Sequence, residues 1–410
     1  MSSRSQARTA LALLTALNFF NYIDRSVLFA VQPLVQQEFH RSDRDFGLLT
    51  SSFFFCYMIA APFMGWLADR YPRRVIIALG ALLWSSATLL TAVTHNFTEL
   101  LVRHTLVGIG EASFVIIAPA FLADLFGEDR RGKILSIFYI AIPVGTALGY
   151  VIGGFMGHRY GWRTPFYVGA GPGFLLAIAI MLIPEPARGA RDTLEATPER
   201  SHVTALVRNR AFLCATLGMA MLTFALGGIS VWMPTFLSRV RHLPLDRANL
   251  IFGIITGING VGATLIGGWL GDRLLRRNNG AYYLLSAASM GLAIPTMAIA
   301  IYVAGPAMFP AIFVTEFVLF LNNGPLNAAI VNSVAAPIRA TALAVNLFVI
   351  HLLGDAFSPT LMGWISDRSS LEVAFGMAIL ASALSSGILL YGARFAPKID
   401  LAKMKAGAAP

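Results

Sequence analysis

The chain has 410 residues, of which 56% are hydrophobic and only 13% are charged. Because soluble domains carry about 25% charged residues to keep their surfaces hydrated, this composition excludes an ordinary soluble protein and indicates a chain embedded in a membrane. The formal net charge of +10 does not indicate a nucleic-acid partner, since the basic residues stand in short clusters between long apolar segments.

The apolar segments predict twelve transmembrane helices. A helix needs about 20 apolar residues to cross the hydrocarbon, and segments of this kind lie at residues 9–33, 46–68, 75–94, 98–124, 133–157, 164–183, 211–237, 248–271, 281–303, 306–333, 338–365 and 371–394. One longer polar connection follows the sixth span. We therefore predict an all-α membrane protein with two six-helix bundles, at residues 1–183 and 211–410, joined by a cytoplasmic linker at residues 184–210.

The charges of the loops predict the orientation of these spans. If the N-terminus is cytoplasmic, most of the Lys and Arg residues lie in loops on that side, including Arg73, Arg74, Arg276 and Arg277. Loops that stay in the cytoplasm retain positive charge, so both termini are predicted to be cytoplasmic. Short loops and a composition rich in alanine and arginine favour a bacterial inner membrane.

The first span contains polar residues where apolar ones are expected: Asn18, Asn21, Asp24 and Arg25. An ionisable side chain at the centre of a span costs about 2.5–3.5 kcal/mol on insertion scales, so it is usually kept for a partner charge or a water-filled cavity. A carboxylic acid in a poorly solvated cavity is stabilised in its protonated form, which suits Asp24 to carry a proton. The alternative is a fixed internal ion pair.

The loops after the second and eighth spans repeat one another. Residues 65–74 and 268–277 align without a gap and are identical at most positions. The repeat predicts two pseudo-symmetric halves that arose by duplication. Gly65 and Gly268 are expected to permit close helix approach. Asp69 and Asp272 lie at the membrane edge, where a carboxylate can face a helix N-terminus or pair with an arginine.

Both segments resemble the loop signature of the major facilitator superfamily, which has a glycine, an Asp-Arg pair and paired basic residues. The resemblance implies a monomeric transporter that binds substrate between its two halves and alternates access around that site. It also implies a gating role for five residues: Asp69, Arg70, Arg74, Asp272 and Arg273. The alternative is that these charges only enforce topology.

The fourth span carries Arg103, His104 and Glu111. His104 and Glu111 are seven residues apart, about two helical turns, so they share one face, whereas Arg103 is turned away by about 100°. By the same reasoning as for Asp24, Glu111 is predicted to handle protons. In the fifth span, Gly145, Gly149, Gly153 and Gly154 predict close helix packing.

The tenth and eleventh spans are the other two with central ionisable residues. The tenth contains Glu316, and the eleventh contains His351 and Asp355, which can touch because they are four residues apart. We therefore predict that spans one, four, ten and eleven line a shared wet cavity. An aromatic wall for an acyl tail is a further hypothesis, although aromatic residues in spans more often only pack. The residues concerned are Phe19, Phe20, Phe53, Phe54 and Phe55 in the first two spans and Phe348 and Phe357 in the eleventh.

Several runs resemble the spinster family of facilitators. They are residues 21–25 (Asn-Tyr-Ile-Asp-Arg) in the first span, 107–114 and 118–126 in the fourth, 135–145 in the fifth and 354–359 in the eleventh. The resemblance extends over most of the chain and is most marked between residues 18 and 155. It implies transport of a lysophospholipid or a sphingoid phosphate, an amphiphile with a charged head and one acyl-like tail.

Carried over by position, Asp24 and Glu111 would be the acidic pair of proton coupling. The family usually has an arginine seven residues before the glutamate, where this chain has His104. Either Arg103 serves instead, or His104 is a weaker and pH-dependent phosphate partner. The full set of candidate substrate contacts is Asn21, Tyr22, Arg25, Arg103, His104, Glu316, His351 and Asp355.

Other classes of function fit less well. A small organic anion, such as a sugar acid, is the alternative cargo on the same fold, but the second half offers no arginine at mid-depth. A membrane scaffold or receptor gives no reason for buried acids. The sequence has no HExxH, GxSxG, phosphate-binding glycine loop or Cys/His cluster with metal spacing, so we expect no enzyme, no metal and no other cofactor. The expected partners are the bilayer, the substrate and protons.

Overall fold

The computed structural model describes residues 3–126, 128–187, 206–334 and 338–397, and every regular element within these ranges is helical. The helices are α1 (Ser3–Phe39), α2 (Asp43–Arg70), α3 (Arg73–Thr91), α4 (Phe97–Leu125), α5 (Glu128–Tyr139), α6 (Ala141–Tyr160), α7 (Thr164–Met181), α9 (Arg210–Arg239), α10 (Leu245–Leu275), α11 (Ala281–Tyr302), α12 (Met308–Phe320), α13 (Asn323–Asn332), α14 (Arg339–Ile350), α15 (Ser358–Arg368) and α16 (Leu371–Gly392). A π-helical turn at His351–Asp355 joins α14 to α15, and a 3-10 turn at Ala393–Phe395 follows α16.

Eleven segments of the described chain are long and apolar enough to cross a membrane. Three of them are broken spans, made of α5 with α6, α12 with α13, and α14 with α15. Helix α1 has 37 residues but is not among the eleven, because its polar residues, Asn18, Asn21, Asp24 and Arg25, lower its hydropathy. The predicted all-α fold with twelve membrane helices is therefore confirmed.

Each broken span has a proline or glycine at its break. Pro143 lies just inside α6, and its ring clashes with a helical carbonyl four residues earlier, at Tyr139, where α5 ends. Pro325 has the same relation to Leu321, between α12 and α13. Gly354 has φ −99° and ψ −107°, which interrupts the helix within the π turn. The sequence analysis did not predict these breaks.

Several helix starts are stabilised by side chains that cap free backbone N–H groups. Ser42 Oγ accepts from the backbone N–H of Asp45 before α2, and Asn96 Oδ1 accepts from that of Glu99 before α4. Ser370 Oγ accepts from the backbone N–H of Val373 before α16. Replacing such a cap by alanine typically costs about 1 kcal/mol.

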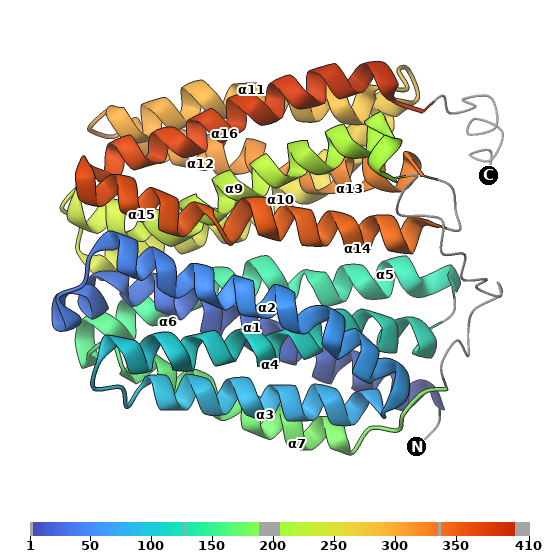
Figure 1. Ribbon diagram of the computed structural model, residues 1–410, viewed down its shortest axis with the longest axis horizontal. Coiled ribbons are helices and arrows are strands. Elements are labelled where there is room, and N and C mark those ends of the chain that lie inside the picture. The colour runs from blue at the N-terminus through green and yellow to red at the C-terminus, as the bar shows by residue number, and fades with distance from the viewer. Residues whose placement is uncertain (1–2, 127, 188–205, 335–337, 398–410) are drawn as a thin grey trace. The chain divides into compact units, whose positions relative to one another are not determined.

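Contacts divide the chain into two compact units. The first comprises Met1–Glu195, Ser230–Gly257 and Pro359–Arg368, and the second comprises Ala196–Ile229, Ile258–Ser358 and Ser369–Pro410. In the first unit, α1 to α7 run side by side (Figure 1). The ends of α9, α10 and α15 that belong to this unit pack onto them, as when Tyr150 Oη donates to the carbonyl of Ser230 at 2.7 Å.

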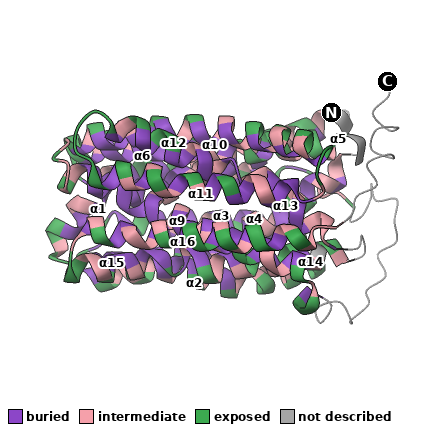
Figure 2. Cartoon of the chain, turned by 90° about the horizontal axis from the view of Figure 1, so that it is seen from above, coloured by how far each residue is buried: buried purple, intermediate pink, exposed green. Residues whose placement is uncertain are grey.

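Within each unit, buried residues lie on the sides of the helices that face their neighbours, and exposed residues lie on the outer sides (Figure 2). Many outer residues are large and apolar, such as Ile59, Leu175 and Leu182. A water-soluble protein rarely exposes so many large apolar side chains, whereas lipid solvates them without cost. The chain is therefore a multi-pass integral membrane protein.

The glycines of α6 bring its backbone against α1, as the sequence predicts. A Cβ added at Gly145 would lie 2.5 Å from the carbonyl oxygen of Phe19, and one at Gly149 would lie 2.7 Å from that of Ile23. Real Cβ atoms do not approach so closely, so only glycine permits this helix spacing.

The end of α1 is tied to the start of α7 through Glu38. Arg163 donates to both carboxylate oxygens, at 2.7 and 2.8 Å, and Trp162 Nε1 donates to one of them at 2.7 Å. The hydrogen bonds from Arg163, and then that from Trp162, hold the pKa of the Glu38 carboxyl below its usual range.

We expect Glu38→Gln to lower the melting temperature slightly at pH 7. A carboxyl whose pKa is depressed in the folded state contributes stability above its unfolded pKa, about 4.3, and loses it as the pH falls through the folded value. The difference between variant and wild type should therefore shrink as the pH falls below about 4.3 and disappear once the pH is below the folded pKa. Its size should stay below about 1 kcal/mol, because the pair is partly exposed. A difference that persists at acidic pH would contradict this assignment.

Candidate functional site

A cluster of ionisable residues lies inside the first unit, between α1 and α4. Asn21, Asp24, His104 and Glu111 are all buried, and Glu111 has no exposed surface. Arg25 Nη2 donates to Glu111 Oε2, so the two residues form an ion pair that connects the helices. Of the predicted polar residues of the first and fourth spans, Asn21, Asp24, Arg25, His104 and Glu111 are thus brought together around one buried salt bridge.

Aromatic rings surround the guanidinium of Arg25. Its Cζ atom lies 4.9 Å from the ring centres of Tyr22 and Phe53, 5.6 Å from that of Phe54 and 5.9 Å from that of Tyr57. The faces of aromatic rings attract cations, most strongly where water is excluded. The site therefore combines a fixed positive charge with apolar walls supplied largely by α2.

His104 completes the wall on the α4 side. Its ring stacks on that of Phe53 at 5.4 Å, with an angle of 29° between the planes. A Cβ added at Gly108 would lie 2.5 Å from the carbonyl oxygen of Phe53, so α2 and α4 are in close backbone contact at this level. This close contact between the helices places the His104 ring against the ring of Phe53, beside the ion pair.

Asp24 faces α7. A Cβ added at Gly169 would overlap Asp24 Oδ1, and this oxygen has no hydrogen-bond partner among the described residues. Because Gly169 has no side chain, the carboxylate of Asp24 fits against α7 at this position. The sequence analysis did not identify Gly169, because one glycine in a glycine-rich span carries no distinguishing signal.

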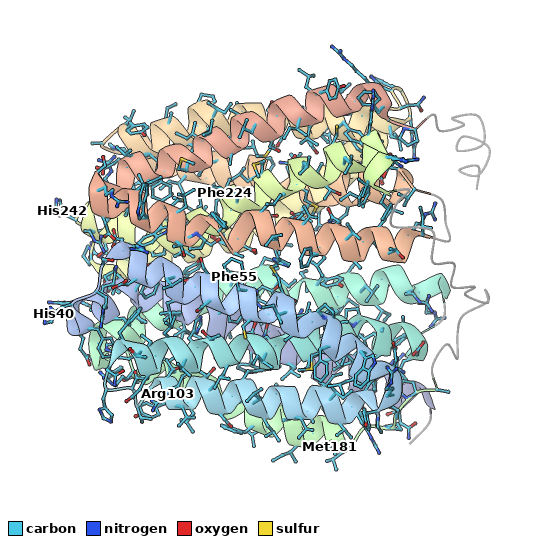
Figure 3. All side chains as sticks on the ribbon, in the orientation of Figure 1. His40, Phe55, Arg103, Met181, Phe224 and His242 are labelled. Atoms are coloured by element: carbon cyan, nitrogen blue, oxygen red, sulfur yellow. The ribbon has the colours of Figure 1, made fainter. Side chains whose placement is uncertain are left out.

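Arg103 lies outside the cluster, on the side of α4 that is next to α3 (Figure 3). Its Nη1 donates to the carbonyl of Leu90 on α3 at 2.6 Å, and its Nη2 lies 3.3 Å from Glu99. Of the two basic residues considered for the fourth span, only His104 is at the site. The guanidinium at the site is that of Arg25, from α1.

The predicted gating residues of the first half form few of the expected contacts. No hydrogen bond or ion pair of the Asp69 side chain is recorded among the described residues. Arg70 lies over the ring of Trp66 at 4.1 Å, and Arg74 Nη1 donates to the carbonyl of Ile183 at 2.8 Å. The expectation that Gly65 permits close helix approach is wrong, since a Cβ there would meet no atom within 4 Å.

The corresponding residues of the second half are also paired differently from the expectation. Asp272 accepts a hydrogen bond of 2.6 Å from Tyr282, and Arg273 lies 5.5 Å from the ring centre of Trp269. The expectation for Gly268 is also wrong, since a Cβ there would meet no atom within 4 Å; the glycine that the close approach requires is Gly324, where a Cβ would lie 3.0 Å from the Cα of Gly268.

Arg73, which was not among the predicted gating residues, is the buried arginine of the first loop motif. It lies 2.6 Å from Asp124 on α4 and 3.2 Å from Glu185 after α7. Glu185 also accepts from the backbone N–H groups of Arg73 and Arg74 at the start of α3. Paired basic residues do not show from sequence which one turns inward.

The other predicted substrate contacts belong to the second unit. His351 and Asp355 do touch, with Nδ1 of the histidine 2.9 and 3.0 Å from the two carboxylate oxygens. They share the π turn of His351–Asp355. Glu316 is buried on α12.

A further buried charge in the first unit, Asp43 at the start of α2, was not predicted. Its carboxylate accepts from Arg239 on α9 at 2.8 Å, from Gln36 on α1 at 2.8 Å and from Ser366 on α15 at 2.6 Å. Asp367 in turn accepts from the backbone N–H of Asp43 at 2.8 Å. Acidic residues are common in the first turn of a helix, and Asp45 lies in the same turn, so the sequence does not distinguish Asp43 from an ordinary residue of a helix start.

Comparisons with known proteins identify the family of the chain. The family model described as Major Facilitator Superfamily matches residues 14–359. The chain is 37% identical over 393 residues to protein spinster homolog 3 of Danio rerio, covering 90% of this chain and 79% of that protein. It is 34% identical over 422 residues to protein spinster homolog 1 of Xenopus laevis, covering 94% and 80%.

The fold is also similar to solved structures. A crystal structure of a bacterial homolog to the human lysosomal transporter Spinster, in an inward-facing and unoccupied conformation, superposes with a TM-score of 0.81. It covers 95% of this chain and 96% of that one at 22% sequence identity, so it bears on the fold alone.

Proposed function

Since the chain belongs to the spinster family of the Major Facilitator Superfamily and is a secondary transporter, we propose that it moves a lysophospholipid or a sphingoid phosphate by alternating access. We propose further that this transport is coupled to protons through Asp24 and Glu111. We place it as a monomer, as the superfamily implies, in a bacterial inner membrane, as the short loops and composition favour. Both termini are cytoplasmic in this proposal, as the loop charges predict. Asp69, Arg70, Arg74, Asp272 and Arg273 then act as gating residues.

The observation that carries this proposal is the buried ion pair of Arg25 and Glu111. An arginine side chain stays protonated at all physiological pH values. The phosphate of an amphiphile and the carboxylate of Glu111 would therefore compete for the same cation. The rings of Tyr22, Phe53, Phe54 and Tyr57 around Arg25 favour a ligand whose charged head is followed by an apolar tail.

Proton coupling follows from this competition. When Glu111 takes a proton it loses its charge, and Arg25 becomes free to bind the anionic head. When the head leaves, Glu111 can release the proton and pair with Arg25 again. One oxygen of Asp24 has no hydrogen-bond partner within the described part of the chain, and Asp24 is adjacent to Arg25 in sequence, so it is suited to pass the proton on. His104, whose ring stacks on that of Phe53, offers a further polar contact beside the pair.

The test is flux of a labelled lysophospholipid into or out of proteoliposomes, with and without an imposed pH gradient. We expect flux driven by the gradient in the wild type and none in Glu111→Gln, because glutamine keeps the shape of the side chain but cannot exchange a proton. Glu99→Gln is the matched control, since Glu99 lies on the same helix at its exposed start. It should transport like the wild type.

Other outcomes divide the proposal into its parts. If lipid flux depends neither on the pH gradient nor on Glu111, proton coupling is contradicted, but the lipid substrate is still supported. Transport of a small carboxylate or sugar acid, with no lipid flux, would favour the organic-anion alternative, for which one buried arginine is also a suitable partner.

A further inference from the structure

An apolar groove of about 580 Å³ lies in the first unit, between α1 and the break that separates α5 from α6. Small-molecule sites usually have volumes of about 300–1,000 Å³. Leu11 and Phe19 line it from α1, and Ile137, Ile140 and Val144 line it from the other side. The groove is separate from the Arg25–Glu111 pair, none of whose residues lines it.

The groove is closed at the end where α6 touches α1 and open at the end where α5 lies beside α1. At Gly145, the backbone of α6 touches the carbonyl of Phe19, which closes one end. Pro143 then interrupts the helix, and α5 and α6 follow one another along the bundle (Figure 1). Bulky residues replace glycine on this face of α5. The closed end is thus at Phe19 and the open end at Arg8, about 16 Å away by the rise of the helix.

The chemistry of the groove is that of a site for one hydrocarbon chain with an anionic head. Its lining is apolar except for Thr15 and Arg8. Arg8 is exposed at the open end, and the first turn of α1 contains no acidic residue. Lys133 lies one turn before Ile137 on the same face of α5. The open end is therefore basic, and the closed end is uncharged.

We propose that this groove is the loading site of the transporter, where the acyl chain of an anionic lysophospholipid lies between α1 and α5 with its phosphate at Arg8. The proposal rests on the proposed function, because it takes the transported lipid as the occupant. With the head at the end where α1 begins and the tail toward the middle of the span, the lipid has the orientation that it has in a leaflet. It would pass from here along α1 to Arg25.

The first measurement uses a lysophosphatidylglycerol with a photoactivatable group in its acyl chain, added to the full-length protein in nanodiscs of neutral lipid. We expect crosslinks on residues 8–19 and 137–144 that unlabelled lysophosphatidylglycerol competes away. Crosslinks that are spread over all outer helix faces, or that are not competed, would overturn the proposal, since they would indicate bulk lipid only.

The second measurement is lysophosphatidylglycerol transport by groove variants. Ala12→Trp places an indole in the groove. Because each methylene group lost from apolar contact weakens binding about fourfold, we expect a KM raised at least about tenfold. Ala383→Trp is the matched control, since Ala383 is an exposed alanine in the middle of α16 and outside the groove. Its KM should equal that of the wild type.

Arg8→Gln tests recognition of the phosphate head independently of binding of the acyl tail. We expect it to raise the KM for lysophosphatidylglycerol and to leave the KM for zwitterionic lysophosphatidylcholine unchanged. Wild-type lipid transport combined with unchanged KM values in Ala12→Trp and Arg8→Gln would overturn the loading site and leave the proposed function intact. Absence of any lysolipid transport by the wild type would overturn the proposed function, and the loading site with it.

Discussion

Arg25→Met is expected to abolish transport and to cause the largest loss of stability of any single change in the site. The substitution leaves the carboxylate of Glu111, which has no exposed surface, without the cation that neutralises it. Removing one partner of a buried pair typically costs about 3–5 kcal/mol, because the other charge stays in a medium of low dielectric constant. Thermal unfolding in detergent micelles would measure the loss relative to the wild type.

The double variant Arg25→Met with Glu111→Gln identifies the cause of this loss. Replacing both members of a buried pair by neutral groups of similar volume is often neutral or stabilising, so we expect most of the stability to return. Transport should stay absent, because the cation that would bind the phosphate is gone. If the single and double variants unfold at the same temperature, the uncompensated charge is not the cause. If Arg25→Met still transports, Arg25 does not hold the head.

Gly169→Ala is expected to reduce proton-driven transport about tenfold or more. The new methyl group would overlap Asp24 Oδ1, so either the carboxylate or α7 has to move. Inserting a methyl group into a packed interior costs about 1–3 kcal/mol, and 1.4 kcal/mol corresponds to a factor of ten. The measurement is the initial rate of lysophospholipid uptake at several pH values.

Gly171→Ala is the matched control for this prediction. It lies two residues away on the same helix, and a methyl group there meets no atom within 4 Å, so the rate should not change. The dependence on pH distinguishes a displaced carboxylate from a merely distorted helix, because only the former alters how the rate responds to the gradient. Equal rates for Gly169→Ala and the wild type would show that the position of Asp24 is not critical.

The two predictions concern different properties of the site. Arg25 and Glu111 determine whether the buried charges balance, which affects both stability and binding. Gly169 determines where Asp24 lies, which should affect coupling more than stability. Comparison of the two sets of variants would therefore separate the requirement for charge balance from the requirement for proton transfer.

The sequence by itself determined the class of protein and most features within single helices. Span length and low charge sufficed for the membrane fold, because the thickness of the hydrocarbon is fixed. Residues on one helix have a fixed angular relation, so His104 and Glu111 were correctly predicted to share a face and His351 and Asp355 to touch. The glycines of α6 were correctly predicted to pack closely, since they recur at every fourth position.

Only the tertiary structure decided which residues of different helices meet. The sequence analysis placed Arg25 and Glu111 in separate roles, but in the structure they form one ion pair. It also left Arg103 and His104 as alternatives, and in the structure Arg103 contacts Leu90 on α3 instead of the site. It could not select Arg73, Gly169 or Asp43. Contacts of this kind depend on how each helix is rotated about its axis and shifted against its neighbours, and periodicity within one helix contains no information on either.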